Sequence, residues 1–219
     1  EEDLALSAEG MVLVDIKADV DDGLLRFIQE CGGTIINAFP QYRAIRARIP
    51  ITQIEAVAGQ AGVRYIDKAH GYILNKKDIS EGDAAHRVPV VRGLGYTGAG
   101  VKVGVISDSV DHLAEVQATG DLPANVTVLQ DDPGSTGEGT AMLEIVHDLV
   151  PGASLYFATA NLGMASFANN IIALKNAGCK VIVDDVSYFA ESPFQDDVIS
   201  QAVRTVTDAG VLYFSSAAN

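Results

Sequence analysis

Two acidic residues are predicted to lie just beyond the carboxyl ends of parallel strands, where functional groups of such sheets usually lie. Asp108 directly follows the apolar run 101–107, which is typical of a buried strand, and Glu138 precedes a helix expected at 139–149. In open parallel sheets the functional site forms beyond the carboxyl ends of the strands. Two carboxylates that meet there can act as a general acid and a general base. We therefore expect Asp108 and Glu138 to lie at one edge of one sheet.

Each acid also has an ordinary structural explanation. An Asp at the end of a strand often caps the next helix or begins a turn. An acidic residue in the first turn of a helix is favoured by the helix dipole. The sequence motifs around Asp108 and Glu138 are therefore needed to choose between a catalytic and a structural role for these residues.

These phrases resemble motifs of the subtilisin-like serine peptidases, or subtilases. The phrase Gly-Tyr-Thr-Gly-Ala-Gly-Val-Lys-Val at 95–103 leads toward Asp108, as a similar phrase leads to the catalytic Asp of that family. Gly139-Thr140 and Pro151-Gly152-Ala153 match a second motif, His-Gly-Thr at the start of a helix that ends in Ala-Pro-Gly-Ala. Glu138 stands where that motif has its catalytic His. The resemblance implies that Asp108 and Glu138 are catalytic residues.

The end of the sequence supplies a third match. Residues 210–219 resemble the family phrase that finishes in Ala-Gly-Asn, with Ala218 in place of the usual Gly. This match implies that Asn219 is the oxyanion donor. Ser187 stands where the family has a Ser-Leu-Gly strand along the substrate groove, so Ser187 and Tyr188 are the predicted substrate-binding residues, although the continuation Tyr188-Phe189 departs from that pattern.

Two further acids interrupt an apolar strand near the predicted cleft. Asp184 and Asp185 fall inside the strand expected at 181–186. Burying a charge costs stability unless the charge is paired or stays at an exposed strand end. The two residues are therefore candidates for shaping substrate preference.

A Glu in the place of His changes the chemistry of the base. In this kind of peptidase the base takes a proton from Ser, and the Asp behind it orients the base. Reference pKa values of about 4.3 for Glu and about 6.5 for His make Glu the weaker base by roughly 3 kcal/mol. Contact with Asp108 opposes this loss, because two adjacent carboxylates cannot both ionise cheaply and so share a proton. Sedolisins, acid-active relatives with a Ser-Glu-Asp arrangement, use a Glu at this place, but their second acid lies four residues along the helix, where this sequence has Met142.

The resemblance implies a serine endopeptidase that acts on polypeptide substrates, and the Asp108–Glu138 pair as its acid and base predicts activity at acidic to neutral pH. No Gly-Thr-Ser-x-Ala nucleophile motif occurs; in subtilases it lies downstream of the oxyanion Asn, so we expect this chain alone to be inactive. One alternative is a noncatalytic pseudopeptidase or peptide-binding module that holds a peptide in the cleft. A generic doubly wound ligand-binding domain is a weaker alternative, because no Gly-rich phosphate loop opens a helix.

The elements that must position these residues follow an α/β pattern. Apolar strands are expected at 101–107, 126–130, 154–158, 181–186 and 211–215, and helices at 139–149, 164–177 and 195–209. Strands this apolar are typical of a mostly parallel sheet with helices on its faces. We predict a doubly wound, mostly parallel α/β fold at 99–219, which the resemblance makes the N-terminal half of a subtilisin-like catalytic domain.

The first 75 residues have a different organisation. Strands expected at 11–17, 34–39, 42–49 and 63–66, with helices after Asp21 and Pro50, give the order β-α-β-β-α-β. This order predicts a small α+β ferredoxin-like domain at 1–75. Subtilases carry such a domain as an intramolecular inhibitory prodomain, whose tail, here roughly Tyr72 to Asn75, enters the substrate groove. Glycines and Pro89 mark 76–98 as a linker that leads into the catalytic part.

Composition argues against several other partners. The net charge of −14 and the lack of a Lys/Arg cluster disfavour nucleic acid. No apolar run approaches the roughly 20 residues that span a bilayer, so we expect no membrane partner. No cofactor is predicted: the acidic loop Asp131–Gly134 is a weak calcium candidate, for which a solvated turn is the simpler interpretation. The prodomain resemblance alone predicts secretion.

Overall fold

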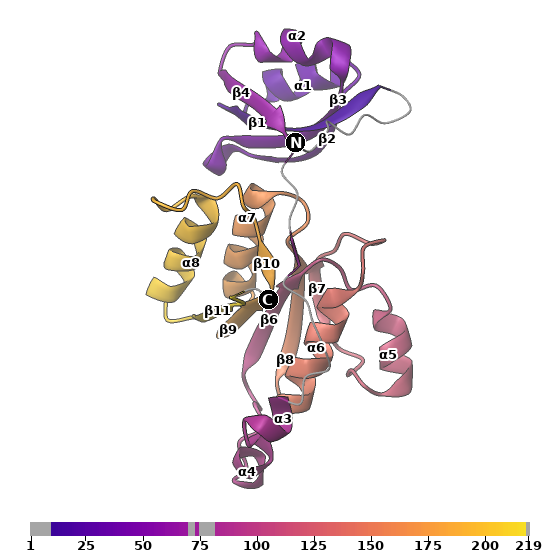
Figure 1. The fold of residues 1–219 in the computed structure, drawn as a ribbon, viewed down its shortest axis with the longest axis vertical. Coiled ribbons are helices and arrows are strands. Elements are labelled where there is room, and N and C mark those ends of the chain that lie inside the picture. The colour runs from indigo at the N-terminus through magenta and orange to yellow at the C-terminus, as the bar shows by residue number, and fades with distance from the viewer. Residues whose placement is uncertain (1–9, 70–72, 75–81, 218–219) are drawn as a thin grey trace. The chain divides into compact units, whose positions relative to one another are not determined.

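The computed structural model describes residues 10–69, 73–74 and 82–217 (Figure 1). The chain divides into two compact units, the first formed mainly by residues up to 71 and the second by most of residues 72–219. The first unit has an antiparallel sheet, and the second has a parallel five-stranded sheet. The protein is therefore a mixed α/β structure.

The first unit alternates strands and helices. Its elements are β1 (Met11–Ala18), α1 (Asp22–Glu30), β2 (Thr34–Phe39), β3 (Ala44–Pro50), α2 (Ile54–Ala58) and β4 (Val63–Lys68). The sheet order is β2-β3-β1-β4, with β1 antiparallel to both of its neighbours. The Asp21 carboxylate accepts a hydrogen bond of 2.8 Å from the backbone N–H of Leu24, which satisfies a donor that the first turn of α1 leaves free.

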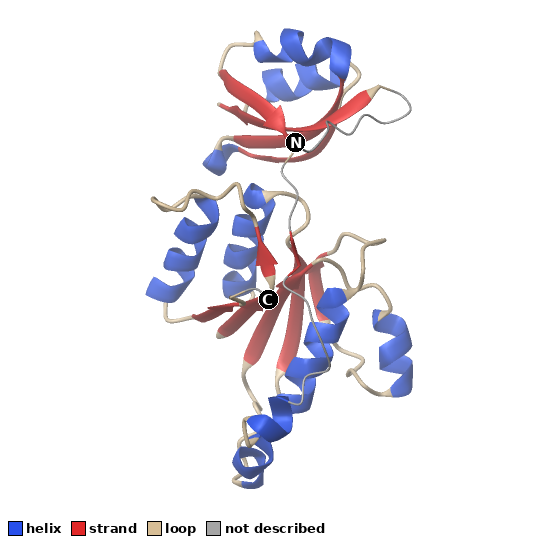
Figure 2. Cartoon of the chain, in the orientation of Figure 1, coloured by secondary structure: helices blue, strands red, loops and turns tan. Residues whose placement is uncertain are grey.

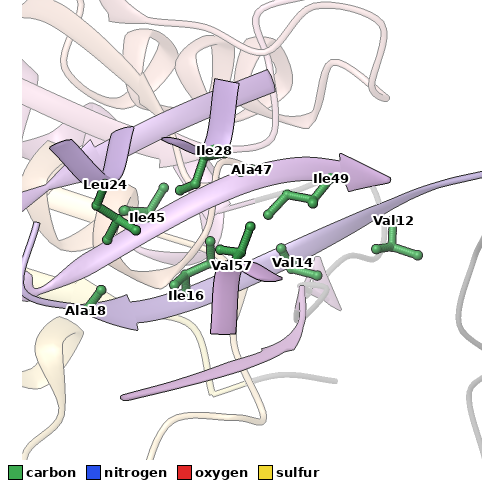
Figure 3. Close-up of a cluster of buried hydrophobic side chains, with 10 residues drawn as sticks. All are labelled: Val12, Val14, Ile16, Ala18, Leu24, Ile28, Ile45, Ala47, Ile49 and Val57. Atoms are coloured by element: carbon green, nitrogen blue, oxygen red, sulfur yellow. The ribbon is translucent and has the colours of Figure 1, made fainter. Parts of the chain in front are cut away.

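The core of the first unit lies between its sheet and its two helices, which cover the same face of the sheet (Figure 2). Since side chains alternate along a strand, every second residue of β1 points to that face. The ten buried members of this core are Val12, Val14, Ile16, Ala18, Leu24, Ile28, Ile45, Ala47, Ile49 and Val57 (Figure 3).

The second unit is built on the parallel sheet. Its elements are β5 (Ile73–Leu74), α3 (Gly82–Ala85), α4 (Val88–Gly93), β6 (Lys102–Ser107), α5 (Leu113–Thr119), β7 (Thr127–Gln130), α6 (Glu138–Leu149), β8 (Ser154–Thr159), α7 (Met164–Asn176), β9 (Val181–Asp184), β10 (Val186–Ser187), α8 (Val198–Asp208) and β11 (Leu212–Ser215). The strand order is β11-β9-β6-β8-β7, and all four pairings are parallel. Two short helices, α3 and α4, lie in the stretch predicted as linker, and α5 was not predicted.

Helices cover both faces of the parallel sheet. On the central strand β6, Val103 and Val105 join a buried cluster with Leu143 of α6. Gly104 lies between them and faces α7 instead, because a Cβ at this position would come within 3.0 Å of Leu174 Cδ1. Consecutive residues of β6 therefore contact helices on opposite sides, which explains why the strand is apolar throughout.

The strand predicted at 181–186 breaks into two pieces. β9 ends at Asp184, whose Oδ1 accepts a hydrogen bond of 3.3 Å from the backbone N–H of Val186. This local bond from side chain to backbone turns the chain away from the parallel ladder. The short strand β10 then pairs with β5 instead of with the large sheet. The carboxyl ends of β6, β9 and β11 are left together at one edge of the parallel sheet.

Candidate acid/base site at the carboxyl edge of the parallel sheet

Asp108 is fully buried at the end of β6 and is surrounded by hydrogen-bond donors. Its Oδ1 accepts from the backbone N–H groups of Ser109 (2.5 Å) and Gly139 (3.1 Å). Its Oδ2 accepts from the backbone N–H and from the hydroxyl of Thr136, at 2.7 and 2.6 Å. Four donors, one from Ser109 and three from the segment 136–139 that leads into α6, therefore hold the Asp108 carboxylate.

These donors decide the charge of Asp108. Burial is the largest single influence and by itself raises the pKa of this carboxyl, but the hydrogen bonds from Thr136, Ser109 and Gly139 together outweigh it and lower the pKa. A carboxylate that accepts several hydrogen bonds is stabilised in its charged form. Asp108 therefore keeps a negative charge inside the protein.

Glu138 is the first residue of α6, beside Asp108. The preceding residue, Gly137, has φ of 76°, a left-handed conformation that glycine adopts without strain. The next residue, Gly139, donates its backbone N–H to Asp108, so the strand-end acid and the first turn of α6 meet at the same sheet edge. Glu138 itself is half-buried, and its Oε2 is shielded from solvent.

Gly139 permits this close approach because it has no side chain. A Cβ at this position would clash with the ring of Phe157 and would lie 2.5 Å from the carbonyl oxygen of Ser109. We expect Gly139→Ala to lower the free energy of unfolding by about 1 to 3 kcal/mol, as overpacking does in a dense core. Urea unfolding of the purified chain measures this change. Gly93→Ala is the matched control, because a Cβ there meets nothing within 4 Å, and an equal loss in both variants would contradict the argument.

Two more carboxyls lie at the same edge, at the end of the neighbouring strand. Asp184 Oδ1 accepts a hydrogen bond of 2.9 Å from the Ser215 hydroxyl of β11, and burial raises the pKa of the Asp184 carboxyl. Burial also raises the pKa of Asp185 to about 7, with the charges of Glu138, Asp184 and Asp108 acting in the same direction and the Ser107 hydroxyl opposing them. The sequence predicted Asp184 and Asp185 as candidates for shaping substrate preference, and their shifted pKa values were not visible in it.

A pocket of about 670 Å³ opens beside these strand ends. Ser187 and Tyr188, the predicted substrate-binding residues, both line it, together with Asp184, Glu191 and Tyr213. Tyr188 is buried, and its hydroxyl donates a hydrogen bond of 2.7 Å to the carbonyl oxygen of Ala160. Tyr188 therefore forms a fixed wall of the pocket, whereas Ser187 is only half-buried.

The backbone of β10 binds an extended segment of the same chain. Val186 pairs with Leu74 and Ser187 with Ile73, in an antiparallel register. Of the predicted prodomain tail, Tyr72 and Asn75 lie outside the described residues, as does Asn219, the predicted oxyanion donor. The structure thus brings Asp108 to the first turn of α6, which carries Glu138, and places Ser187 and Tyr188 along the pocket.

The calcium candidate loop, Asp131–Gly134, contacts the segment after β6. Asp131 Oδ1 accepts a hydrogen bond of 3.0 Å from the backbone N–H of Val110, next to the Asp108 site. Across residues 10–69, 73–74 and 82–217, no group of three or more acidic, His or Cys side chains has the geometry to hold a metal ion. Over the same part of the chain, no helix combines the length and the apolar character needed to cross a bilayer.

Comparison with known proteins gives structural neighbours only. No family model and no curated protein sequence matches this chain. The epidermin leader peptide processing serine protease (EpiP) from Staphylococcus aureus is similar with a TM-score of 0.56 and 12% identity, over 94% of this chain and 59% of that protein. A mutant of the same protease is similar with a TM-score of 0.59 and 11% identity, over 94% and 60%. The chain therefore spans about three fifths of the length of these serine proteases and is similar to them in fold.

Proposed function

We propose that this chain is the prodomain and the N-terminal part of the catalytic domain of a subtilisin-like serine endopeptidase. In this proposal Asp108 and Glu138 form the acid/base pair, and Asn219 donates a hydrogen bond to the oxyanion. The observation that carries it is the 3.1 Å hydrogen bond from Gly139 N to Asp108, because it joins the strand-end acid to the turn that holds Glu138. The fold shared with serine proteases supports the same reaction class.

The proposed chemistry assigns one task to each group. Glu138 takes the proton of the nucleophilic Ser, whose oxygen bonds to the carbonyl carbon of the substrate, and later returns the proton to the leaving amine. Asp108 stays ionised and stabilises the protonated form of Glu138. In subtilisin itself, a donor aimed at the oxyanion contributes about 100 to 1,000-fold in rate. A carboxylate such as Glu138 is a weaker base than His and stays unprotonated to lower pH, so we expect peptide hydrolysis at acidic to neutral pH.

We further propose that the first unit is an inhibitory prodomain of the ferredoxin-like kind. Its order of elements and its sheet order, β2-β3-β1-β4, support the split β-α-β arrangement. The antiparallel pairing of β5 with β10 supports a tail that occupies the substrate groove, since an extended peptide binds an exposed strand in this way. Polypeptide substrates and secretion follow from this proposal, and EpiP, as its name states, processes a leader peptide.

The second candidate function is a noncatalytic peptide-binding module. The β5–β10 pairing favours it equally, because the same backbone donors and acceptors would hold a peptide without cleaving it. The two candidates differ only in whether a bond is broken.

Cleavage of the full-length protein at its own linker tests the proposal. We expect incubation across pH 4 to 8 to release a fragment by cutting near residues 75–80, followed by hydrolysis of added peptides. Mass spectrometry of the fragments locates the cut. An intact chain that binds peptides but cleaves none at any of these pH values would favour the binding module and overturn the peptidase.

A further inference from the structure

We propose that Asp185 is a third acidic member of the Asp108–Glu138 site, a positioning residue that holds the proton shared by the cluster and so leaves Glu138 able to act as the base. This inference rests on the proposed function for the role of Glu138. The placement of Asp185 itself stands on the geometry of the sheet edge. The positions of this chain that match catalytic positions of the family it resembles are Asp108, Glu138 and Asn219, so Asp185 adds to them.

The register of the sheet places Asp185 beside β6. Ile106 of β6 pairs with Asp184 of β9, and the next residues along the two parallel strands are Ser107 and Asp185. Ser107 is fully buried, and Asp185 is 6% exposed. Among the described residues, neither Ser107 Oγ nor Asp185 Oδ1 has a hydrogen-bond partner with good geometry. The Ser107 hydroxyl nevertheless lies close enough to Asp185 to lower the pKa of its carboxyl, so the two buried side chains interact at the carboxyl edge of the sheet.

The charges around Asp185 decide which carboxyl keeps the proton. The charged groups that act on it are Glu138 at the start of α6, Asp184 on its own strand and Asp108 at the end of β6, and all three are acidic. Asp108 is held ionised by its four donors. Carboxylates that share a site cannot all ionise cheaply, so one of them retains a proton. The buried Asp185, whose pKa burial raises to about 7, is that group.

Titration of the carboxyl carbons by NMR tests this placement in the chain as it stands, without any need for peptidase activity. We expect the Asp185 resonance, identified by its loss in Asp185→Asn, to titrate near pH 7. Glu138→Gln removes a like charge and lowers this midpoint by about 1 pH unit. Ser107→Ala removes the hydroxyl that favours the ionised form of Asp185, so this substitution raises the Asp185 midpoint. Glu144→Gln, on the same helix α6, leaves it unchanged.

Opposite shifts of the Asp185 midpoint in Glu138→Gln and Ser107→Ala distinguish a proton-sharing cluster from general damage to the fold. General damage would move the midpoint of both variants toward the value of an unperturbed Asp. A wild-type midpoint near 4, or a midpoint indifferent to Glu138→Gln, overturns the inference. The expected titration in a full-length protein that cleaves no peptide would support the cluster and count against the peptidase function. In an active protein, Asp185→Asn removes the transition near pH 7 from the profile of kcat/KM against pH.

The pH dependence of the chain's stability is a second measurement, and the raised pKa of Asp185 predicts its direction. The Asp185 carboxyl ionises near 3.8 when it is unperturbed, as in the unfolded chain, but near 7 in the folded protein. The unfolded state therefore releases this proton first, and stability falls as pH rises from about 4 to about 7. Asp185→Asn removes this part of the pH dependence and raises the Tm at pH 8 relative to wild type. An unchanged or lower Tm at pH 8, with the Asp185 resonance titrating near 4, contradicts the placement.

Discussion

Glu138→Gln lowers kcat/KM for peptide hydrolysis by roughly 100 to 10,000-fold in the full-length protein, the range expected when a general base is lost. Gln has nearly the same shape as Glu, but its amide cannot accept the proton of a serine hydroxyl. The variant therefore removes the base and leaves the first turn of α6 in place. Initial rates with a fluorogenic peptide at pH 4 to 8 measure the effect.

Glu144→Gln is the matched control for this substitution. Glu144 lies six residues further along the same helix α6 and is also half-buried, but it is away from the sheet edge. We expect its turnover to stay within about twofold of wild type, since substitutions away from special sites have small effects. If Glu138 serves only as a first-turn charge, its replacement costs a few tenths of a kcal/mol in stability and leaves turnover unchanged. Unchanged turnover would remove Glu138 from the mechanism.

Asp108→Asn destabilises the second unit by roughly 2 to 4 kcal/mol at pH 7, the cost of leaving a buried donor without its acceptor. Four donors converge on the two oxygens of Asp108. An Asn side chain has only one oxygen, so its NH₂ group must face either the Ser109 and Gly139 N–H groups or the backbone N–H of Thr136. The same substitution also removes the fixed negative charge that the proposed mechanism uses to stabilise protonated Glu138, so we expect peptidase activity to fall with it.

The pH dependence of the free energy of unfolding shows how much of the contribution of Asp108 to stability comes from its charge and how much from its shape. The pKa of Asp108 is lowered in the folded protein, despite burial, by its hydrogen bonds. Its stabilising contribution is therefore fully present above the unfolded pKa near 3.8 and is lost as pH falls through the lower folded value. We expect urea unfolding to show the deficit of Asp108→Asn in full at pH 7 and a smaller deficit below about pH 3.8.

Asp208→Asn is the control for this experiment. Asp208 is an exposed residue at the end of α8. Its replacement is expected to change the free energy of unfolding by less than about 0.5 kcal/mol. A deficit in Asp108→Asn that stays constant from pH 7 to pH 3 would show that the carboxylate charge of Asp108 does not contribute to stability.

Hydrophobic pattern alone predicted much of the secondary structure. The strand expected at 154–158 is β8 (Ser154–Thr159), and the helix expected at 139–149 is α6 (Glu138–Leu149). Such agreement is physical, because a strand buried on both faces must be apolar along its whole length. The helix α5 was missed: it has no side-chain cap and begins after His112, whose φ of 69° is unusual for a residue with a side chain.

The acidic residues of the candidate site could also be identified from the sequence. Asp108 after a strand and Glu138 before a helix follow from position along the chain, because a parallel sheet brings its carboxyl ends to one edge. The hydrogen bonds of Asp108 were not visible. Thr136 lies 28 residues from Asp108, in a loop whose backbone conformation depends on the packing of α6 against the sheet.

The sequence by itself determined which segments form the strands of a mostly parallel sheet and which acids follow them, since both depend on periodicity and position along the chain. Only the tertiary structure decided the charge state of each acid. Asp108 and Asp185 are the same residue type at equivalent strand ends, yet the pKa of Asp108 is lowered and that of Asp185 is raised to about 7. The reason is that converging N–H and O–H donors stabilise one carboxylate, whereas burial among other carboxyls destabilises the other.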